Sequence, residues 1–485
     1  MSKDDKIDKL KRRKLCFNCV GDSFLSDEIC DQGRRGTCSY CGKRLKTYSM
    51  KQMSGRIESA FEQHYIRTSD RPSSYDYAMM ADKESDYDWD REGEPVVDAI
   101  VNAAEIPEEA ASDIQKILED KYFDFDEAKS GDELEFSSDS YYEESSTSDR
   151  KWQEEWEYFE RSLKTEARFF SRSASILLAS VFDGIDTMQT RGQKSVIVDA
   201  GPDTDFSSLF RARSFQSDDE LKFALARPDI HIGSPPSAHA SAGRMNARGI
   251  SVFYGANDPM VALAEVRPPV GSKVVVARFK IIRPIRLLDL TALNAAMTPG
   301  SIFDPTMIDR LERTMFLRNL SRRIIVPVMP NDETFEYLAT QAIADFLATE
   351  NNPNLDGIIF PSVQTSGEAL NCVLFHKAAR VEEIELPKGT EISARLGTFY
   401  EEGWEDEFSV TEEVSPQKEE QENKQPLSFG SMSFFDDPVD QGDFIAHPST
   451  LKVDLESVHV HIVDAVQFTT KKHGVSRFRW EKHEA

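Results

Sequence analysis

The sequence lacks the features that mark several large classes of protein. It has no run of about 18 apolar residues, so we expect no membrane span, and its first 15 residues contain no apolar signal core. It has neither a GxGxxG turn nor a P-loop, the glycine-rich signatures of many nucleotide-binding proteins. Its six cysteines are too few for a disulfide framework in a chain of 485 residues. Together these absences predict a cytoplasmic protein.

Positive charge is also scarce. The chain carries 58 Lys and Arg against 85 Asp and Glu, which gives a net charge of −27. Nucleic acids and anionic membranes are polyanions, so we expect neither of them as a partner of the whole protein, although a local basic site is compatible with this charge. A hydrophobic content of 39% is low for a chain that is packed throughout, which predicts that some polar stretches are irregular.

Four of the cysteines form two CxxC pairs, Cys16 with Cys19 and Cys38 with Cys41, and 18 residues separate the pairs. Two residues between cysteines let both sulfurs face one ion, so the spacing predicts a zinc site, with two pairs of free thiols as the alternative. Four thiolate ligands leave no coordination position open, so this zinc would be structural. Cys30 lies outside the pattern.

The rest of the sequence predicts an α+β protein. Apolar residues at helical spacing predict helices over 49–185, including a long aromatic helix at 152–182, and short strands alternate with helices after about 200. The predicted organisation is a zinc knuckle at 1–48, a helical domain at 49–185 with an acidic linker at about 124–150, an α+β domain at 200–385 plus 450–475, and an acidic flexible insertion at 386–447.

The helical part also contains an arginine and a histidine, Arg56 and His64, a combination that suggests a ribonuclease site. Helical neighbours lie three or four residues apart, and seven residues separate this pair, so the two side chains do not share one face cleanly. We therefore interpret both as surface residues.

The residues best suited to chemistry gather in 243–267, GRMNARGISVFYGANDPMVALAEVR. A glycine-bracketed basic turn carries Arg244, a short apolar run ends at Tyr254, and an alanine-rich helix ends near Glu265. Elements this short can bring three side chains to one cleft. A guanidinium binds phosphate or carboxylate, a tyrosine stacks on a flat ring, and a carboxylate holds ribose hydroxyls or stabilises positive charge. The set favours a nucleotide as the ligand.

Several motifs in this half of the chain resemble the RES domain, a family named for Arg, Glu and Ser. The matching pieces occur in chain order: LFRAR, GRMNARG, VFYGANDPMVALAEVR, LLDLT, YLATQAIAD, DGIIFPS and LNCVLF. They cover residues of about 207–380, with a closing strand near 453–470. The N-terminal third resembles the HEPN-like domain found ahead of some RES domains, without that domain's usual arginine-to-histidine nuclease motif.

The resemblance implies a fold related to ADP-ribosyltransferases and a toxin that degrades NAD, its substrate, at the nicotinamide–ribose bond, with water or phosphate as acceptor. It also implies a protein partner, either an Xre-type antitoxin or another regulatory protein. The chain is in addition a candidate homodimer. The family's named residues fall on Arg244, Glu265 and Ser362, its pocket tyrosine on Tyr254, and its first-strand arginine on Arg211. The N-terminal extension and the acidic insertion depart from the compact family pattern.

In the resulting hypothesis, Arg244 and Arg211 grip the NAD diphosphate or carboxamide, and Tyr254 stacks on nicotinamide or ribose. Glu265 stabilises an oxocarbenium-like transition state, and Ser362 supplies a hydrogen bond to the pocket. Neutral nicotinamide leaves, so little proton transfer is needed. Two alternatives remain: an ADP-ribosyltransferase that modifies a macromolecule with the same pocket, and an inactive zinc and helical interaction protein.

Overall fold

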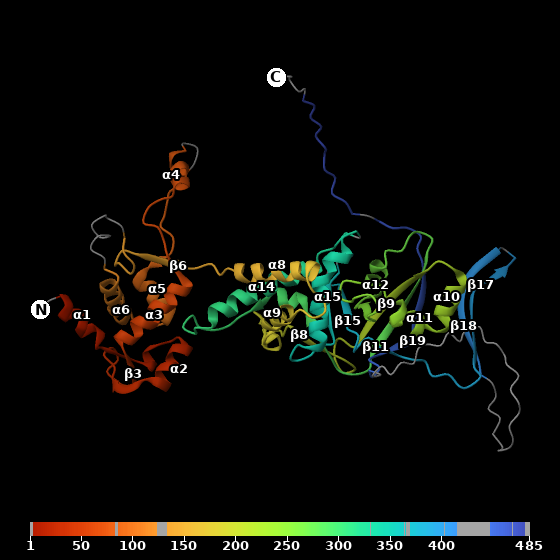
Figure 1. Cartoon of the computed structure of the whole chain (residues 1–485), viewed down its shortest axis with the longest axis horizontal. Coiled ribbons are helices and arrows are strands. Elements are labelled where there is room, and N and C mark those ends of the chain that lie inside the picture. The colour runs from red at the N-terminus through yellow and green to blue at the C-terminus, as the bar shows by residue number, and fades with distance from the viewer. Residues whose placement is uncertain are drawn as a thin grey trace, which may run out of the picture. The chain divides into compact units, whose positions relative to one another are not determined.

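The structure is a computed structural model, and it describes residues 3–82, 86–123, 133–329, 331–362, 364, 369–401, 403–414, 447–467 and 469–480. The chain divides into two compact units: unit 1 contains Met1–Tyr158 and Ala295–Leu320, and unit 2 contains Phe159–Asn294 and Ser321–Ala485. The predicted α+β class is confirmed, because unit 1 is mainly helical with a cysteine cluster and unit 2 contains a large mixed sheet (Figure 1). No helix within these described ranges is long and apolar enough to cross a membrane.

Unit 1 begins with a small antiparallel sheet that carries the cysteines. Its strands follow the order β1-β3-β2. Ser49 and Gln52 then start helix α3 with a reciprocal capping box, in which each side chain accepts a hydrogen bond from the other's backbone N–H. The elements of this unit are α1 (Lys3–Lys11), β1 (Lys14–Cys16), η1 (Phe17–Cys19), α2 (Ser23–Gln32), β2 (Arg34–Thr37), β3 (Arg44–Ser49), α3 (Met50–His64), β4 (Tyr65–Arg67), α4 (Ser74–Ala81), β5 (Glu94–Pro95), α5 (Val96–Ala104), α6 (Glu108–Lys121), β6 (Tyr141–Glu144) and β13 (Ala296–Met297).

The core of unit 1 extends into the acidic segment that we expected to be a linker. Strand β6 pairs with β4 on one side and β5 on the other. Phe136 and Tyr142 are buried, and their rings lie 5.2 to 5.7 Å from the ring of Phe61. Aromatic burial of this kind outweighs the acidic composition of the segment. The described part of this stretch, from residue 133, therefore belongs to the folded unit, and residues 124–132 lie outside the described ranges.

Unit 2 is built on one mixed sheet of nine strands, in the order β16-β19-β11-β9-β10-β15-β14-β12-β8. The pairs β12–β14 and β16–β19 are parallel, and the other pairs within this sheet are antiparallel. The strands are β8 (Ile197–Ala200), β9 (Ser208–Phe215), β10 (Phe253–Ala256), β11 (Lys273–Ile281), β12 (Ile285–Asp289), β14 (Gly357–Pro361), β15 (Leu370–Leu374), β16 (Val381–Glu382) and β19 (Leu451–Ile462).

Strand β11, an interior strand of the sheet, packs against apolar residues on both faces. Alternate residues of β11 enter two apolar clusters: Val275 and Phe279 join one, and Val274 and Val276 join the other. A strand covered on both sides is apolar throughout, which accounts for the VVVA run in its sequence. The second cluster also contains Val261 and Ala262 of helix α12 (Pro259–Glu265), so this helix lies against one face of the sheet.

The remaining elements of the chain are helices and short strands outside the nine-stranded sheet. They are α8 (Arg150–Thr165), α9 (Arg172–Phe182), η2 (Ile185–Thr187), β7 (Gln189–Thr190), α10 (Asp218–Ala226), α11 (Pro228–His231), η3 (Ser237–His239), α13 (Leu290–Asn294), α14 (Met307–Ile325), α15 (Glu333–Thr349), β17 (Glu391–Tyr400) and β18 (Gly403–Glu413).

Two predicted segments differ from the structure. The long helix expected over 152–182 is two helices, α8 and α9, because Ser171 accepts a hydrogen bond from Ala174 N and starts a new helix. The first part of the expected flexible insertion forms the antiparallel hairpin β17–β18. Along the first half of β17, exposed and half-buried residues alternate, as expected for a strand with one covered face, despite the acidic composition of the segment. Residues 415–446 of that insertion lie outside the described ranges.

Candidate functional site

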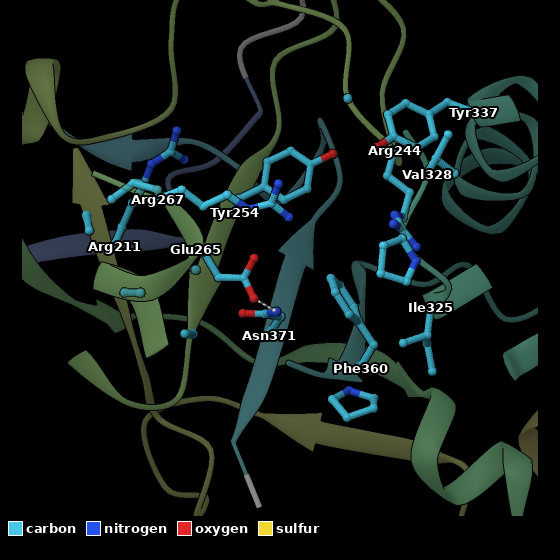
Figure 2. A pocket seen from close by; sticks show the side chains of 18 of the residues that line it. Arg211, Arg244, Tyr254, Glu265, Arg267, Ile325, Val328, Tyr337, Phe360 and Asn371 are labelled. Carbon is cyan, nitrogen blue, oxygen red and sulfur yellow. Dashed lines mark hydrogen bonds between the residues drawn. The ribbon is translucent and has the colours of Figure 1, made fainter. Parts of the chain in front are cut away.

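A cavity of about 440 Å³ opens in unit 2 where strands β9 and β10 separate. Strand β9 pairs with β11 along its length and β10 pairs with β15, but the register between β9 and β10 joins Phe210 to Ala256 alone. The sheet therefore splits beyond this pair, and side chains from both strands reach the gap. Figure 2 shows most of the lining residues, which come from β9, β10, α12, α14, α15, β14, β15 and three loop segments.

Glu265 reaches the cavity from the C-terminal end of α12. Asp258 caps this helix by accepting hydrogen bonds from Met260 N and Val261 N, and Pro259 occupies its first turn. The local sequence thus fixes where the helix begins. Because Glu265 is the last residue of this helix, the same signals also fix the position of Glu265. The sequence predicted an alanine-rich helix that ends near Glu265, and this helix is confirmed.

The Glu265 carboxylate is held by two donors, Ser362 directly after β14 and Asn371 on β15. Ser362 Oγ donates to its Oε1 at 2.8 Å. Asn371 Nδ2 donates to the same oxygen at 2.7 Å, and Figure 2 shows this second bond. Both bonds end on Oε1, which fixes the plane of the carboxylate and leaves Oε2 to bind a ligand. A charged oxygen held in a fixed direction costs little reorganisation when positive charge develops beside it.

The loop 243–249 is fastened to helix α15. Gln341 Nε2 donates to the carbonyls of Gly243 at 2.8 Å and Asn246 at 3.0 Å. Thr340 Oγ1 donates to the carbonyl of Arg244 at 2.5 Å. Two adjacent residues of one helix therefore hold the backbone on both sides of Arg244, which sets the position from which its side chain reaches the cavity.

The Arg244 guanidinium is oriented by groups on the same side of the cavity. Its Nη1 donates to the carbonyl of Ile324, and its central carbon lies 5.6 Å from the centroid of the Tyr337 ring. Figure 2 shows Arg244 and Tyr337 together, across the cavity from Glu265. Arg244 and Glu265 therefore share one cavity from opposite sides.

Tyr254 both lines the cavity and holds the loop in place. Its hydroxyl accepts a hydrogen bond from Met245 N at 3.1 Å and donates to Asn246 Oδ1 at 3.0 Å. Burial raises the pKa of Tyr254 to about 12, so the phenol stays protonated at neutral pH. A Cβ on Gly243 would lie 2.7 Å from the Tyr254 oxygen, which explains the glycine at this position.

Arg211 lies on β9, at the split in the sheet. Its guanidinium carbon lies 4.9 Å from the centroid of the Phe253 ring. Burial, reinforced by the charge of Arg213, lowers the pKa of Arg211 to about 10, which still leaves it charged at neutral pH. Its Nη1 is inaccessible to solvent and has no hydrogen-bond partner among the described residues. A buried guanidinium N–H without an acceptor is a strong donor for an incoming anion.

The structure thus brings four of the five predicted site residues to one cavity: Arg211, Arg244, Tyr254 and Glu265. The fifth, Ser362, contacts the cavity through its bond to Glu265.

Sequence reasoning missed three contributors to this cavity: Asn371, Tyr337 and Arg267. Asn371 is the one polar residue in the apolar strand motif LNCVLF, and this is the signal that could have identified it. Arg267 follows α12 with φ of +45°, a left-handed conformation that costs energy in a residue other than glycine and that occurs often at functional sites.

Replacing Tyr254 by phenylalanine should destabilise unit 2. The change leaves Met245 N and Asn246 Oδ1 without a partner, and an unpaired buried polar group costs about 1–3 kcal/mol. Urea unfolding should show a lower midpoint with an unchanged slope. Tyr337→Phe is the matched control, because that hydroxyl makes one long bond of 3.3 Å to Glu333 and should change stability little. Equal midpoints for Y254F and the wild type would contradict the assigned role of the hydroxyl.

The four predicted zinc ligands also come together, in unit 1. The sulfur atoms of Cys16, Cys19, Cys38 and Cys41 all lie within 4.8 Å of one another. Three of these separations are 3.5, 3.6 and 3.9 Å. A tetrahedral zinc–thiolate site with bonds of about 2.3 Å has sulfurs about 3.8 Å apart, so the four residues fit this ion. Cys30 is exposed and outside the group.

The cysteine cluster is tied to the helices of unit 1 by a buried carboxylate. Tyr40 lies between Cys38 and Cys41, and its hydroxyl donates to Asp113 Oδ2 on α6 at 2.7 Å. Arg13 Nη1 donates to the same oxygen at 2.5 Å. Asp113 is buried, so this small network fixes the knuckle against the helical core.

In unit 1, Arg56 makes an ion pair and a hydrogen bond, and His64 is buried in the core. Arg56 Nη2 pairs with Glu28 at 2.8 Å and donates to the carbonyl of Phe303. His64 is buried rather than on the surface as expected, because it lies on the core side of α3, and burial lowers its pKa. The two side chains therefore do not form a paired site.

The fold and the cavity together define a mixed α+β domain whose central sheet splits around an arginine, a tyrosine and a carboxylate. Residues 209–395, which include every predicted residue of this cavity, match the RES domain family model. The match supports the RES resemblance for this part of the chain. No curated protein and no solved structure matches the chain.

Proposed function

We propose that unit 2 is an NAD-degrading enzyme that cleaves the bond between nicotinamide and ribose. The observation that carries this proposal is the Glu265 carboxylate, which Ser362 and Asn371 fix inside a cavity that also contains two arginines. NAD has an anionic diphosphate and a cationic nicotinamide ring. The arginines can therefore bind the diphosphate, while the carboxylate, at a separate place in the cavity, lies beside the cationic end. The match to the RES domain supports the same assignment.

In the proposed reaction, the bond between ribose C1′ and the nicotinamide nitrogen breaks, and its electron pair leaves with neutral nicotinamide. The ribose becomes oxocarbenium-like, and Glu265 stabilises this positive charge through Oε2 or through a ribose hydroxyl. A water oxygen then bonds to C1′ and releases one proton to the solvent. Positioning and electrostatics carry such a reaction, so no acid or base histidine is required at the cavity.

The arginines would hold the rest of the dinucleotide. Arg211 has a buried N–H without an acceptor among the described residues, and Arg244 is fixed at the other side of the cavity. Guanidinium groups bind diphosphate oxygens with two parallel hydrogen bonds. The Tyr254 hydroxyl is engaged with the loop, so this residue would contact nicotinamide or ribose with its ring face.

The direct test is to incubate the purified full-length protein with NAD, with and without phosphate, and to identify the products by mass spectrometry. We expect nicotinamide together with ADP-ribose, or with ADP-ribose 1-phosphate when phosphate is the acceptor. ADP-ribose attached to a protein or nucleic acid would instead establish the transferase alternative. Intact NAD in both samples would overturn the proposal and favour an inactive interaction protein.

We also propose that a cell uses this activity as a toxin controlled by a second protein, an antitoxin or a regulator. NAD loss would stop growth, so uncontrolled activity would be harmful to the producing cell. Expression of the chain alone should lower cellular NAD. Normal NAD levels during expression of a protein that is active when purified would show that the host itself controls it.

Replacing Asn371 by aspartate should make the activity depend on pH. The new carboxylate would lie where an amide now donates to Glu265 Oε1 at 2.7 Å. Two carboxylates this close share a proton, and the pKa of the pair rises. Below that raised pKa the shared proton replaces the amide donor, whereas above it both groups are charged and repel each other. The turnover number of N371D should therefore fall as the pH increases from about 5 to 8.

Asn354→Asp is the control for this experiment, because Asn354 is exposed and its side chain has no assigned role in the cavity. That variant should keep the wild-type pH profile. A parallel pH profile for N371D and the wild type would contradict the proposed contact between residue 371 and the reacting carboxylate.

A further inference from the structure

A second cavity, of about 490 Å³, lies on the other side of Arg211 in unit 2. Its walls include Arg211 and Arg213 of β9, His231 at the end of α11, and His239 in the following loop. Arg211 lines both this cavity and the one that contains Glu265. Ala212 lines both cavities as well, so the two cavities adjoin along β9 at Arg211 and Ala212.

The second cavity carries the positive charge of two arginines, Arg211 and Arg213. Two arginines and two histidines line it, and none of its lining residues is acidic. The nearby carboxylate of Asp229 is already neutralised, because Arg227 donates to it at 3.0 and 2.6 Å and the backbone of Ile384 donates at 2.8 Å. No acidic side chain therefore offsets the charge of the arginines inside the cavity.

The guanidinium of Arg213 is held in place before any ligand binds. Arg213 Nη1 donates to the carbonyl of His231 at 2.8 Å, which joins β9 to α11 across the cavity. Burial, with the charge of Arg213 next in importance, lowers the pKa of His231, so its imidazole is neutral at neutral pH and can donate one N–H. Donors that are already oriented lose little entropy when an anion arrives.

Arg211 supplies the strongest argument for a ligand. Its Nη1 is inaccessible to solvent and lacks a hydrogen-bond partner among the described residues. A buried donor without an acceptor is costly, and an anion in the second cavity would provide the acceptor. Phosphate has several acceptor oxygens and binds guanidinium groups bidentately, so it can contact Arg211 and Arg213 together.

We propose that this second cavity binds a phosphate group, which Arg211 connects to the cavity around Glu265. The inference rests on the proposed function only for the origin of that phosphate. It belongs either to the diphosphate of the dinucleotide or to free orthophosphate that acts as acceptor. In the second case a phosphate oxygen bonds to ribose C1′ in place of water, nicotinamide leaves with the electron pair, and the product is ADP-ribose 1-phosphate.

Anion binding can be measured without any turnover. We would titrate the full-length protein with orthophosphate and, separately, with pyrophosphate, and follow the ³¹P resonance. The variants are Arg213→Gln and His239→Asn, and Arg172→Gln is the control, because Arg172 is an exposed arginine on α9 outside both cavities. Circular dichroism establishes that each variant is folded.

We expect saturable binding of at least one anion, with R213Q weaker than wild type by about 10-fold or more, since a hydrogen bond to a charged group contributes about 1.5–3 kcal/mol. H239N should weaken binding less, and R172Q should not change it. Absence of saturable binding, or equal binding by R213Q and the wild type, would overturn the proposal.

The two sources of phosphate give different results. Pyrophosphate binding together with a raised KM for NAD in R213Q, at an unchanged kcat, identifies the diphosphate of the dinucleotide. Orthophosphate binding together with a smaller share of ADP-ribose 1-phosphate in R213Q identifies the acceptor. If NAD is never cleaved and R213Q still loses anion binding, the proposed function fails while the phosphate site remains.

Discussion

Glu265→Gln should abolish NAD cleavage and leave the protein folded. Glutamine has the same shape, and its carbonyl oxygen can still accept the hydrogen bonds from Ser362 and Asn371. It lacks the negative charge that stabilises the oxocarbenium-like ribose. Loss of one oriented electrostatic group typically lowers kcat by about 10²–10³-fold, and the full charge here should place the effect at or above the upper end of that range.

The measurement is nicotinamide release at saturating NAD, combined with thermal unfolding of both proteins. Glu350→Gln is the matched control, because Glu350 is exposed at the end of α15 and makes the same change in charge. It should retain wild-type turnover. Wild-type turnover by E265Q would remove Glu265 from the mechanism, even if NAD is the substrate.

Removal of zinc should have the second large effect, this time on the stability of unit 1. We propose one zinc ion at Cys16, Cys19, Cys38 and Cys41, whose sulfurs fit a tetrahedral site. Zinc supplies about 10–16 kcal/mol in isolated finger peptides, and unit 1 has a core of its own, so the loss should be smaller here. A loss of about 5 kcal/mol would lower the Tm by about 10–20 °C in a domain of this size.

Elemental analysis should show one zinc per chain, and calorimetry with and without a strong chelator should show the lower Tm. Cys38→Ser should behave like the chelated protein. Cys30→Ser is the control, because Cys30 is exposed and outside the cluster, and it should keep both the metal and the Tm. A C38S variant that retains one tightly bound zinc would rule out the four-cysteine site.

Much of the fold could be predicted because its signals are local. The predicted alternation of short strands with helices after about residue 200 is confirmed, for example at β9, β11, β15 and α15, since apolar runs and helical spacing report burial directly. The errors occurred where tertiary packing overrode composition. Acidic residues hid the aromatic core positions Phe136 and Tyr142, and a serine cap inside a continuous helical pattern hid the boundary between α8 and α9.

In the candidate site, too, some residues could be predicted from the sequence and others could not. The resemblance to the RES domain named Arg211, Arg244, Tyr254, Glu265 and Ser362, and short motifs carry all five. Asn371 went unrecognised, because a single amide in an apolar strand is ordinary until its partner is known. The second cavity could not be predicted at all, since its two histidines lie on either side of a proline-rich segment, His231 at the end of α11 and His239 at the end of η3, and the path of this segment depends on packing.

The sequence by itself determined the elements whose causes lie within a few residues. These are the two CxxC pairs, the glycine-bracketed loop that holds Arg244, and the capped helix that ends at Glu265. Only the tertiary structure decided which residues from distant parts of the chain contact these elements. Ser362 and Asn371 reach Glu265 across 97 and 106 residues of chain, and the cavity exists because β9 and β10 separate after one pair of residues. Strand order and sheet splitting follow from packing of the whole core, so no local pattern encodes them.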